Sequence, residues 1–484
     1  MKKLVKSIKY YLLPAIGLLL LGVQQALAVG FMINAPSHNT GIANAGSAVY
    51  DRSVASISNN PAAMSLMSQK QIGGSLAVVI PDWEVNEGWD CSLDNSCADS
   101  NVSNLAAIPA FGIVRPMDHD FTWGMGFGAA AGSGMEYGNT WLGRGLLTEN
   151  SVSVLELMNA ISWRMNKKWT FGVGVGVLWG EYHQDQDLPS LNASFGSTNP
   201  EDVLTLVGDI QNCASVPAPQ KPGCIDQAMQ DSGITPADIT AGVENVTNIR
   251  DYANGQQGTT VEQEGDDIGA KVTLGLTFEP IPGHRLGAAY HYMSDFVFEG
   301  STKINGKFLS DQTAQTPYST LTWNMPDRFV LSGSHELTST LELFWDFERV
   351  FFDTFEDTTL RLDNYHPTVV DRNFKDANRY AVGGEYAWND RLILQLGLSF
   401  DESPVEDEDR IADIPLEEIT KTSFGAIYQV TDDFNVHGYL LLEFLGDGEV
   451  HQLASVDGSK VGSRVNFDTD VMVYVLGASF GYKF

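Results

Sequence analysis

The C-terminal end of the chain alternates strictly between two kinds of side chain. A period of two places successive residues on opposite faces of a β-strand. One face is small, polar or β-branched, and carries Val473, Gly477, Ser479, Gly481 and Lys483. The other face is apolar and largely aromatic, with Met472, Tyr474, Leu476, Ala478, Phe480, Tyr482 and Phe484. An amphipathic strand that ends on an aromatic residue is typical of the closing strand of a bacterial outer-membrane barrel.

The N-terminal end predicts export. Residues 1–28 have the three parts of a signal peptide: basic Lys2, Lys3, Lys6 and Lys9, an apolar core from Leu12 to Val23, and the cleavage motif Ala26-Leu27-Ala28. The alternative is a membrane anchor, but this core is about a dozen residues long and contains Pro14, whereas a spanning helix needs roughly 20. No later apolar run is long enough to span, so a membrane protein of this sequence has to be a closed barrel. We therefore expect it in the bacterial outer membrane.

The net charge and the cysteines limit which binding partners and which covalent links are expected. The chain has 29 basic and 61 acidic residues, and loss of the leader's four lysines leaves 25 against 61, a net charge near −36. Nucleic acid is therefore excluded as a partner. Four cysteines in an exported chain favour disulfides, and of the three possible pairings we favour the local ones, Cys91–Cys97 and Cys213–Cys224. A metal site is not expected, because no Cys-x-x-Cys or neighbouring histidine accompanies them.

The rest of the chain predicts an all-β fold, a fourteen-stranded antiparallel transmembrane β-barrel over residues 71–484. Short and long connections alternate, and the longest, over residues 183–266, is an outer loop. Short periplasmic turns opposite long outer loops are the topology of such barrels. The expected strands are Gln71–Val79, Ala107–Val114, Phe121–Tyr137, Val152–Met165, Trp169–Tyr182, Asp267–Phe278, Arg285–Phe298, Thr320–Glu336, Thr340–Phe352, Phe374–Ala387, Leu392–Asp401, Thr420–Gln429, Phe434–Phe444 and Asp468–Phe484.

Residues 29–70 precede the first expected strand and predict a small helical hatch, or plug, inside the barrel. The segment is rich in alanine, glycine and serine, which would let short helices pack tightly. Asn60 followed by Pro61 suits a helix start, with asparagine as N-cap and proline at the first helical position. In the strand from Trp169, glycines at alternate positions leave an inward face smooth enough for a plug or a passage.

The third expected strand, Phe121–Tyr137, contains an unusual number of glycines for a strand. Gly132 and Gly134 follow three alanines, and glycine inside a strand marks a bulge or a close backbone approach. One interpretation is simple room for packing against the plug. The functional interpretation is a kink that breaks pairing with the next strand and opens a lateral hole at Gly132 and Gly134.

Several motifs together resemble the FadL/TodX family of outer-membrane transporters for long-chain fatty acids and other hydrophobic compounds. They are Gly30-Phe31, the Gly41-x-Ala43-x-Ala45 run, Asp51, Asn60-Pro61-Ala62, Gly134-Met135-Glu136-Tyr137, Leu321-Thr322-Trp323-Asn324-Met325-Pro326, Phe374-Lys375-Asp376-Ala377-x-Arg379 and Phe400-Asp401-Glu402-Ser403-Pro404-Val405. The resemblance covers essentially the whole mature chain. It implies a fourteen-stranded barrel, an N-terminal hatch carrying Asn-Pro-Ala, and a kinked third strand through which substrate leaves sideways into the bilayer.

The chain departs from this family where carboxylate recognition is expected. Gly180-Glu181-Tyr182-His183-Gln184-Asp185 is acidic and neutral where the fatty acid branch carries basic residues, and Pro415-Leu416-Glu417-Glu418 lacks the family's basic motif. Lys375 and Arg379, four apart in an expected strand, share a face and are the best inward candidates for a head group. The alternative, which we favour, is that they pair with acids such as Asp51 or Asp376.

The sequence thus predicts passive uptake of hydrophobic small molecules, either long-chain fatty acids or aromatic and aliphatic hydrocarbons. The hatch residues expected to line the passage are Val29, Gly30, Phe31, Asn60, Pro61 and Ala62. No catalytic motif or cofactor site is present, and we expect a monomer surrounded by outer-membrane lipid and lipopolysaccharide. The alternatives are a hydrophilic diffusion porin, or a surface receptor or adhesin. The acidic run Glu406-Asp407-Glu408-Asp409 suits either a solvated loop, which we favour, or Ca²⁺.

Overall fold

The computed structural model describes residues 36–86, 101–117, 120–188, 227, 257–306, 314–355, 357–363, 368–456 and 459–484. The expected leader, Val29, Gly30, Phe31 and all four cysteines lie outside these residues. The disulfide pairing therefore stays a prediction.

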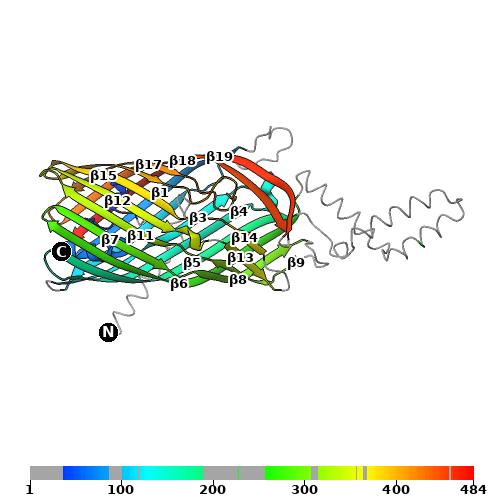
Figure 1. Ribbon diagram of the computed structural model, residues 1–484, viewed down its shortest axis with the longest axis horizontal. Helices are drawn as coiled ribbons and strands as arrows, with labels where there is room; N and C mark the ends of the chain where they lie inside the picture. The colour runs from blue at the N-terminus through cyan, green and yellow to red at the C-terminus, as the bar shows by residue number, and fades with distance from the viewer. Residues whose placement is uncertain are drawn as a thin grey trace.

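Fourteen strands form a closed antiparallel ring, in which β1 pairs with both β2 and β19 (Figure 1). In ring order they are β1 (Gln71–Asn86), β2 (Ala106–Pro116), β3 (Phe121–Glu136), β4 (Glu149–Arg164), β5 (Trp169–Leu188), β6 (Thr259–Ile281), β7 (His284–Met293), β11 (Asp327–Glu336), β12 (Leu341–Phe351), β15 (Ala377–Asn389), β16 (Leu392–Asp401), β17 (Ile419–Gln429), β18 (Phe434–Val456) and β19 (Ser459–Lys483). The predicted fold is confirmed.

Five shorter strands extend the wall beyond one end of the ring: β8 (Phe296–Asn305), β9 (Ala314–Gln315), β10 (Tyr318–Trp323), β13 (Asp357–Leu362) and β14 (Thr368–Asp371). β8 pairs with the outer part of β6, and β10 pairs with β8 and β13. Two expected strands each correspond to parts of two strands: Arg285–Phe298 spans β7 and the start of β8, and Thr320–Glu336 spans β10 and β11. Pro326 explains the second interruption because it has no backbone N–H for a ladder, and Met325 N donates instead to Asp295 Oδ1 at 3.0 Å.

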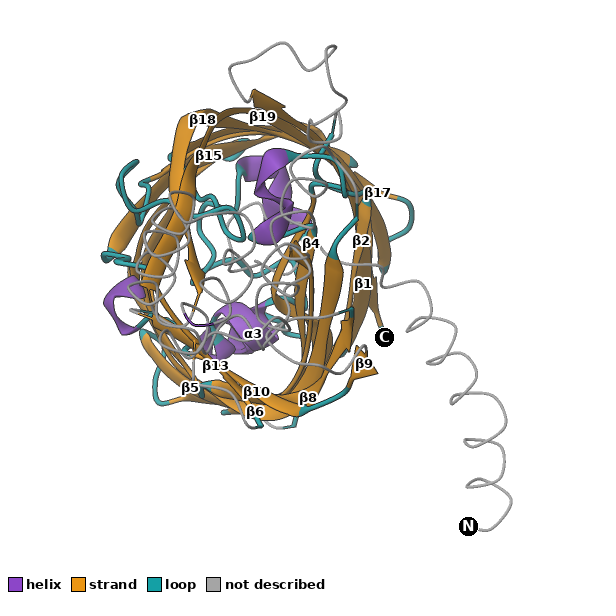
Figure 2. Ribbon diagram, turned by 90° about the vertical axis from the view of Figure 1, so that its right-hand side faces the viewer, coloured by secondary structure: helices purple, strands orange, loops and turns teal. Residues whose placement is uncertain are grey.

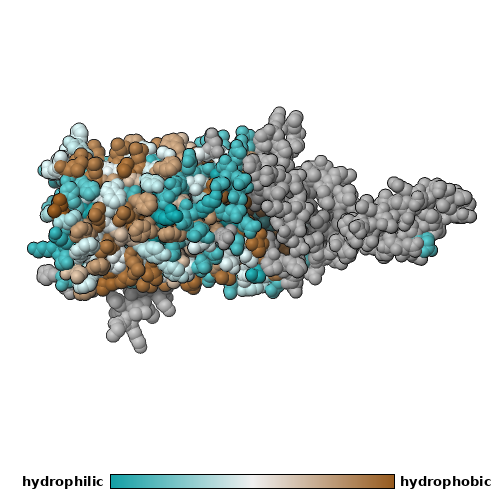
Figure 3. Space-filling model, viewed as in Figure 1, coloured by the Kyte–Doolittle hydropathy of each residue, from teal (hydrophilic) through white to brown (hydrophobic). Residues whose placement is uncertain are grey.

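The outer surface of the ring carries a belt of exposed apolar side chains, brown in Figure 3. On β5 the belt consists of Trp169, Phe171, Val173, Val175, Val177 and Trp179, every one of which is more than a third exposed. A tryptophan at each end of this row is the arrangement of two aromatic girdles around a lipid-facing band. Among the described residues, no helix is long and apolar enough to span a membrane.

Residues 36–70, here called the inner segment, lie inside the ring as short turns of helix (Figure 2). They form η2 (His38–Ile42), α3 (Ser56–Asn59) and η3 (Pro61–Leu66), while η5 (Leu142–Gly145) and η7 (Phe352–Thr354) belong to outer connections. Asn60 is the N-cap of η3: its Oδ1 accepts from Ala62 N at 3.0 Å. Its Nδ2 donates to Ala48 O at 2.6 Å and to Leu276 O of β6 at 3.1 Å.

The glycine face of β5 makes room for this segment. A Cβ placed on Gly172 would collide with the backbone at Pro61 and Ala62. The expectation that alternate glycines leave inward space for a plug is therefore met at this strand.

Candidate functional site

The ladder between β2 and β3 stops partway up the wall. It runs from Pro116–Thr122 to Phe111–Phe127 and then ends. Beyond that pair, β2 residues 106–110 remain paired with β1, and β3 residues 128–136 remain paired with β4. Within the described residues, the two facing edges of β2 and β3 share no further ladder, so the wall is discontinuous there.

A bulge in β3 accompanies this break. The register with β4 shifts between Ala129 and Ala131, so that Ala130 has no partner across the ladder. An extra residue bends the strand that carries it. The kink was expected to break pairing with the next strand, and this is corrected: pairing with β4 continues on both sides of the bulge, and the break lies on the opposite edge, towards β2.

Gly132 and Gly134 lie on the edge of β3 that has lost β2. Each faces a serine of β4, Ser153 and Ser151 respectively. At the outer end this edge is covered by a short segment, because Ser103 Oγ donates to Gly134 O at 3.1 Å and Glu136 N donates to Val102 O at 2.7 Å. The discontinuity is thus bounded by ladder hydrogen bonds at one end and by residues 102–103 at the other.

A narrow cavity leads from the inner segment into this discontinuity. On the barrel side the cavity is lined by Ala110, Phe111, Phe127 and Gly128. On the inside it is lined by residues of the inner segment, among them His38, Val54 and Ser58. Phe111 is 51% exposed on the outer surface of the barrel, so the same cavity joins the interior to the lipid-facing side. Its volume is only about 30 Å³, about the space of one water molecule.

Charged residues fasten the inner segment to the wall on the far side. Arg285 lies 2.6 Å from Asp51 and 3.1 Å from Glu342, and Arg52 lies 2.7 Å from Glu342 and also pairs with Glu385. Buried ion pairs of this kind fix geometry more than they add stability. The inner segment is therefore held at one side and borders the cavity at the other.

Arg379 belongs to this network. Its guanidinium lies 3.1 Å from Glu348, 3.6 Å from Asp401 and 3.8 Å from Asp346, and it donates to Ala43 O at 2.7 Å. It does pair with protein acids, but not with the two that were suggested. Asp51 pairs with Arg285, and Asp376 pairs with Arg349 at 2.7 Å.

Lys375 does not share a face with Arg379. β15 begins only at Ala377, so Lys375 precedes the strand. Its side chain is 63% exposed and pairs with Glu406 of the outer loop. The expected inward position of Lys375 was wrong, because the period-two argument holds only inside a strand.

Every buried lysine or arginine among the described residues has a carboxylate partner. The pairs are Arg144 with Asp187, Lys271 with Glu156, Arg285 with Asp51, Arg328 with Glu348, Arg372 with Asp413, Arg379 with Glu348 and Arg410 with Glu417. Glu156 also lines the cavity at the break in the wall. Among the described residues, an anionic head group would therefore meet no fully buried lysine or arginine that lacks an acidic partner.

An apolar cluster fills the interior near the outer connections. It includes Trp323, Phe355 and Phe374, with Val405, Ile414 and Leu416 from the loop of residues 402–418. Arg372 lies over the Phe355 ring at 4.7 Å and pairs with Asp413 at 2.7 Å. Sequence reasoning missed Arg372, because an isolated arginine before a strand gives no sign of the aromatic rings that will surround it.

The same loop holds its acidic run in separate pairs. Glu406 pairs with Lys375, Asp407 lies 2.6 Å from Arg410, and Asp409 accepts from Asn373 Nδ2 at 2.8 Å. These acids do not converge on one point, and the described residues group three possible metal ligands only elsewhere. The geometry favours a paired surface loop over a Ca²⁺ site.

His38 is a polar group at the inner end of the cavity. It belongs to the inner segment rather than to a spanning strand, and burial lowers its pKa to about 4. Its Nε2 lies 2.8 Å from Asn435 Oδ1, and its ring stacks on His437 at 5.2 Å. At neutral pH the cavity therefore meets an uncharged imidazole.

A closed barrel with an outward apolar belt and a filled interior is the architecture of a bacterial outer-membrane protein. The sequence-family model described as outer membrane protein transport protein (OMPP1/FadL/TodX) matches residues 19–484. The chain belongs to this family, which transports hydrophobic compounds across the outer membrane and is not a family of enzymes.

Relatives and solved structures agree with this placement. The chain is 22% identical over 477 residues to the long-chain fatty acid transport protein of Escherichia coli K12, covering 95% of each, and 21% identical over 493 residues to outer membrane protein P1 of Haemophilus influenzae, covering 96% and 97%. It resembles the crystal structure of a Pseudomonas aeruginosa FadL homologue, with TM-score 0.72, 17% identity and coverage of 94% and 100%. For the toluene transporter TodX of Pseudomonas putida the values are 0.61, 16%, 94% and 99%.

Proposed function

We propose that this protein passes hydrophobic molecules from the outside into the outer leaflet of the membrane through the discontinuity between β2 and β3. The observation that carries the proposal is the end of the β2–β3 ladder at Phe111 and Phe127, where a cavity meets both the inner segment and the lipid-facing surface. The inner segment acts as a hatch. Gly132 and Gly134 border the exit, and Asn60, Pro61 and Ala62 anchor the hatch to the wall.

The passage runs downhill and needs no energy source. A hydrophobic molecule partitions into the apolar cluster near the outer connections, since burial of apolar surface is worth about 25 cal/mol per Å². A shift of the inner segment then widens the cavity and opens it to the lipid. Lateral release bypasses the polar lipopolysaccharide layer. Because the molecule has to leave again, its affinity for the interior is moderate.

The favoured substrate is neutral or weakly polar. A buried carboxylate without a cation or several donors is costly, and each buried cation of the described interior already has an acid beside it. Aromatic and aliphatic hydrocarbons meet this requirement, as do protonated fatty acids. TodX of Pseudomonas putida, which has a similar fold, is a toluene transporter.

A hydrophilic diffusion porin fits less well. It needs an open, charge-lined lumen, whereas residues 36–70 and the apolar clusters fill this one. A receptor or adhesin role would rest on the outer loops and would leave uptake unchanged on deletion of the gene.

Filling the discontinuity tests the proposal. In Gly128→Val, the new Cβ lies 3.5 Å from Ala110 Cβ, an ordinary contact, and the two methyl groups occupy the gap. Toluene uptake by cells that depend on this protein should fall to the level of cells lacking it. Gly438→Val is the matched control, because a Cβ there meets only Gly477 O at 4.0 Å. Normal uptake in Gly128→Val would rule out this exit.

A further inference from the structure

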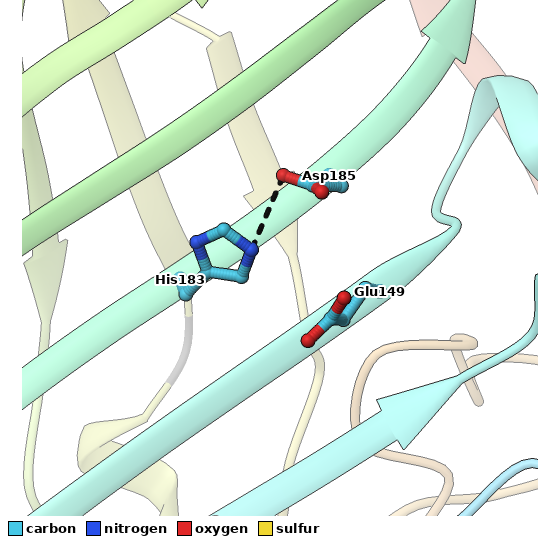
Figure 4. A group of neighbouring side chains, drawn as sticks. All are labelled: Glu149, His183 and Asp185. Carbon is cyan, nitrogen blue, oxygen red and sulfur yellow. Dashed lines mark ion pairs between the residues drawn. The ribbon is translucent and has the colours of Figure 1, made fainter.

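Three metal-ligating side chains meet on the outer face of the barrel, away from the discontinuity. Glu149 begins β4 and lies directly opposite Asp185 of β5. His183 lies two residues before Asp185 and therefore on the same face. Figure 4 shows the imidazole and both carboxylates turned towards one another, with His183 Nε2 3.3 Å from Asp185 Oδ1. One donor atom from each of the three lies within 4.8 Å of the other two.

The position of this cluster is set by the strand ladders. Trp179 marks the outer edge of the apolar belt on β5, and Glu181, His183 and Asp185 continue the outward face beyond it. A groove of about 1130 Å³, lined by Trp179, Glu149 and His183 among others, opens beside the cluster. The cluster therefore stands just outside the lipid-facing band, where water and small ions have access. Its side chains are half-buried rather than free to splay: His183 is 35% exposed and Asp185 29%.

Electrostatics give the cluster a reason to take up a cation. Like charges directly opposite in a ladder are destabilising, and Glu149 and Asp185 are such a pair. On the other side of β5, Glu264 faces His183 and Glu262 faces Asp185. Lys303 forms ion pairs with those two acids, at 2.9 Å from Glu264 and 3.8 Å from Glu262. A divalent ion between Glu149 and Asp185 would attract both carboxylates.

The donor set selects the kind of ion. Imidazole nitrogen together with carboxylate oxygen suits Zn²⁺ and related first-row ions, whereas Ca²⁺ and Mg²⁺ prefer oxygen alone. Zinc–ligand bonds of about 2.0–2.2 Å require the three donors to draw together slightly, which the flexible side chain of Glu149 allows. The groove leaves the fourth position to water. We propose that Glu149, His183 and Asp185 form a binding site for Zn²⁺ or a similar divalent ion on the outer face of the barrel.

The bound ion would stiffen the outer end of β3. Thr148, which precedes Glu149, donates its N–H to Asp185 O at 2.8 Å, and its own carbonyl accepts from Tyr137 N at 2.9 Å, just after β3. A cation that joins β4 to β5 at this level would therefore hold Thr148 in place, and Thr148 is hydrogen-bonded to Tyr137 at the end of β3. No metal was expected from the sequence, and these three ligands come together only through the pairing of β4 with β5.

Zinc titration of the purified barrel tests the site. Protein without a histidine tag, stripped with EDTA, is titrated calorimetrically with Zn²⁺ at pH 7.5 and again with Ca²⁺. We expect one Zn²⁺ per chain, weak Ca²⁺ binding, and loss of the Zn²⁺ signal in His183→Gln and in Glu149→Gln. Zn²⁺ should also raise the heat-unfolding temperature of the wild type, because a ligand that binds only the folded state stabilises it.

Glu181→Gln is the matched control. Glu181 occupies the same outward face of β5, one position nearer the membrane, and is not one of the three proposed ligands. Binding that survives Glu181→Gln and is lost in His183→Gln supports the site, provided that both variants fold with wild-type heat stability in EDTA. Equal weakening by the two substitutions would reveal a diffuse acidic surface. That result, absence of Zn²⁺ binding, or Ca²⁺ binding that does not need His183 would overturn the proposal.

Discussion

Phe111 and Phe127 are the last residues that pair β2 with β3 before the two strands part. Both line the cavity that reaches the inner segment, and Phe111 is half exposed on the lipid side. A β-barrel abolishes free strand edges by closure, so an interrupted ladder within a closed ring is unusual. Here the bulge at Ala129 and Ala131 bends β3, while its pairing with β4 keeps the rest of the ring shut.

Substrate charge can be tested at Lys375. Because this lysine is exposed and pairs only with the loop residue Glu406 among the described acids, Lys375→Met should leave uptake of both fatty acid and toluene unchanged. The unfolding temperature should stay close to that of the wild type, as for most surface substitutions. A competition assay with labelled oleate and labelled toluene measures the ratio of fatty acid uptake to toluene uptake. A selective loss of oleate uptake would show that Lys375 recognises the carboxylate.

Arg379 gives the opposite expectation. Arg379→Met leaves Asp346 without its cation among the described residues and removes one of the two cations beside Glu348, which keeps Arg328 at 3.0 Å. Breaking a buried pair on one side costs about 3–5 kcal/mol. We therefore expect a lower unfolding temperature and poorer recovery of folded barrel, with both substrates affected alike. The electrophoretic mobility of heated and unheated samples measures the fraction of folded barrel. A fully stable variant that loses only fatty acid uptake would contradict the structural role.

Asn60 should control how firmly the hatch is held. Asn60→Ala removes the cap of η3 and both bonds to Ala48 O and Leu276 O. A lost N-cap alone costs about 1 kcal/mol. Hydrogen exchange should become faster across residues 36–70 and remain unchanged in the barrel strands. Asn59→Ala, at a neighbouring position for which the described residues show no side-chain hydrogen bond, is the control; equal effects of the two would argue against the anchoring role.

The hatch should loosen in acid because of His38. Burial lowers the pKa of His38 to about 4, from 6.5 when exposed. Between these values the undocked segment binds a proton that the docked one does not, so docking weakens as pH falls from about 6.5 to about 4. His437, Asn435, Ser479 and Arg52 are the groups that face this ring. Hydrogen exchange of residues 36–50, corrected for intrinsic rates, should rise at pH 4.5 in wild type and much less in His38→Gln. An equal rise in both would exclude His38 as the cause.

The strands were predictable and the discontinuity was not, for one physical reason. Alternation along Trp169–Trp179 is a local property, and the exposed side chains of β5 follow it. Pairing between strands is not local. The glycines of β3 signalled an irregular strand, but only the register shows that Gly128 loses its β2 partner while Gly132 keeps its β4 partner.

The ion pairs were also unpredictable, because their partners come together only in the folded chain. Asp51 and Arg285 are far apart in the sequence and meet only because the stretch between η2 and α3 lies beside Arg285 of β7. Asn60 was identifiable, because a cap depends on the residues beside it. Lys375 was misplaced because the start of β15 could not be fixed to within two residues from the pattern alone.

The lateral exit can be tested most directly by locking it. Cβ atoms at Ala110 and Gly128 would lie 3.5 Å apart, within the range of disulfides. In Ala110→Cys/Gly128→Cys, confirmed by peptide mapping, oxidation should abolish toluene uptake and a reductant should restore it. A bridge across the intact β15–β16 ladder at Val382 and Leu398 should do neither. Undiminished uptake through the oxidised β2–β3 bridge would contradict the account.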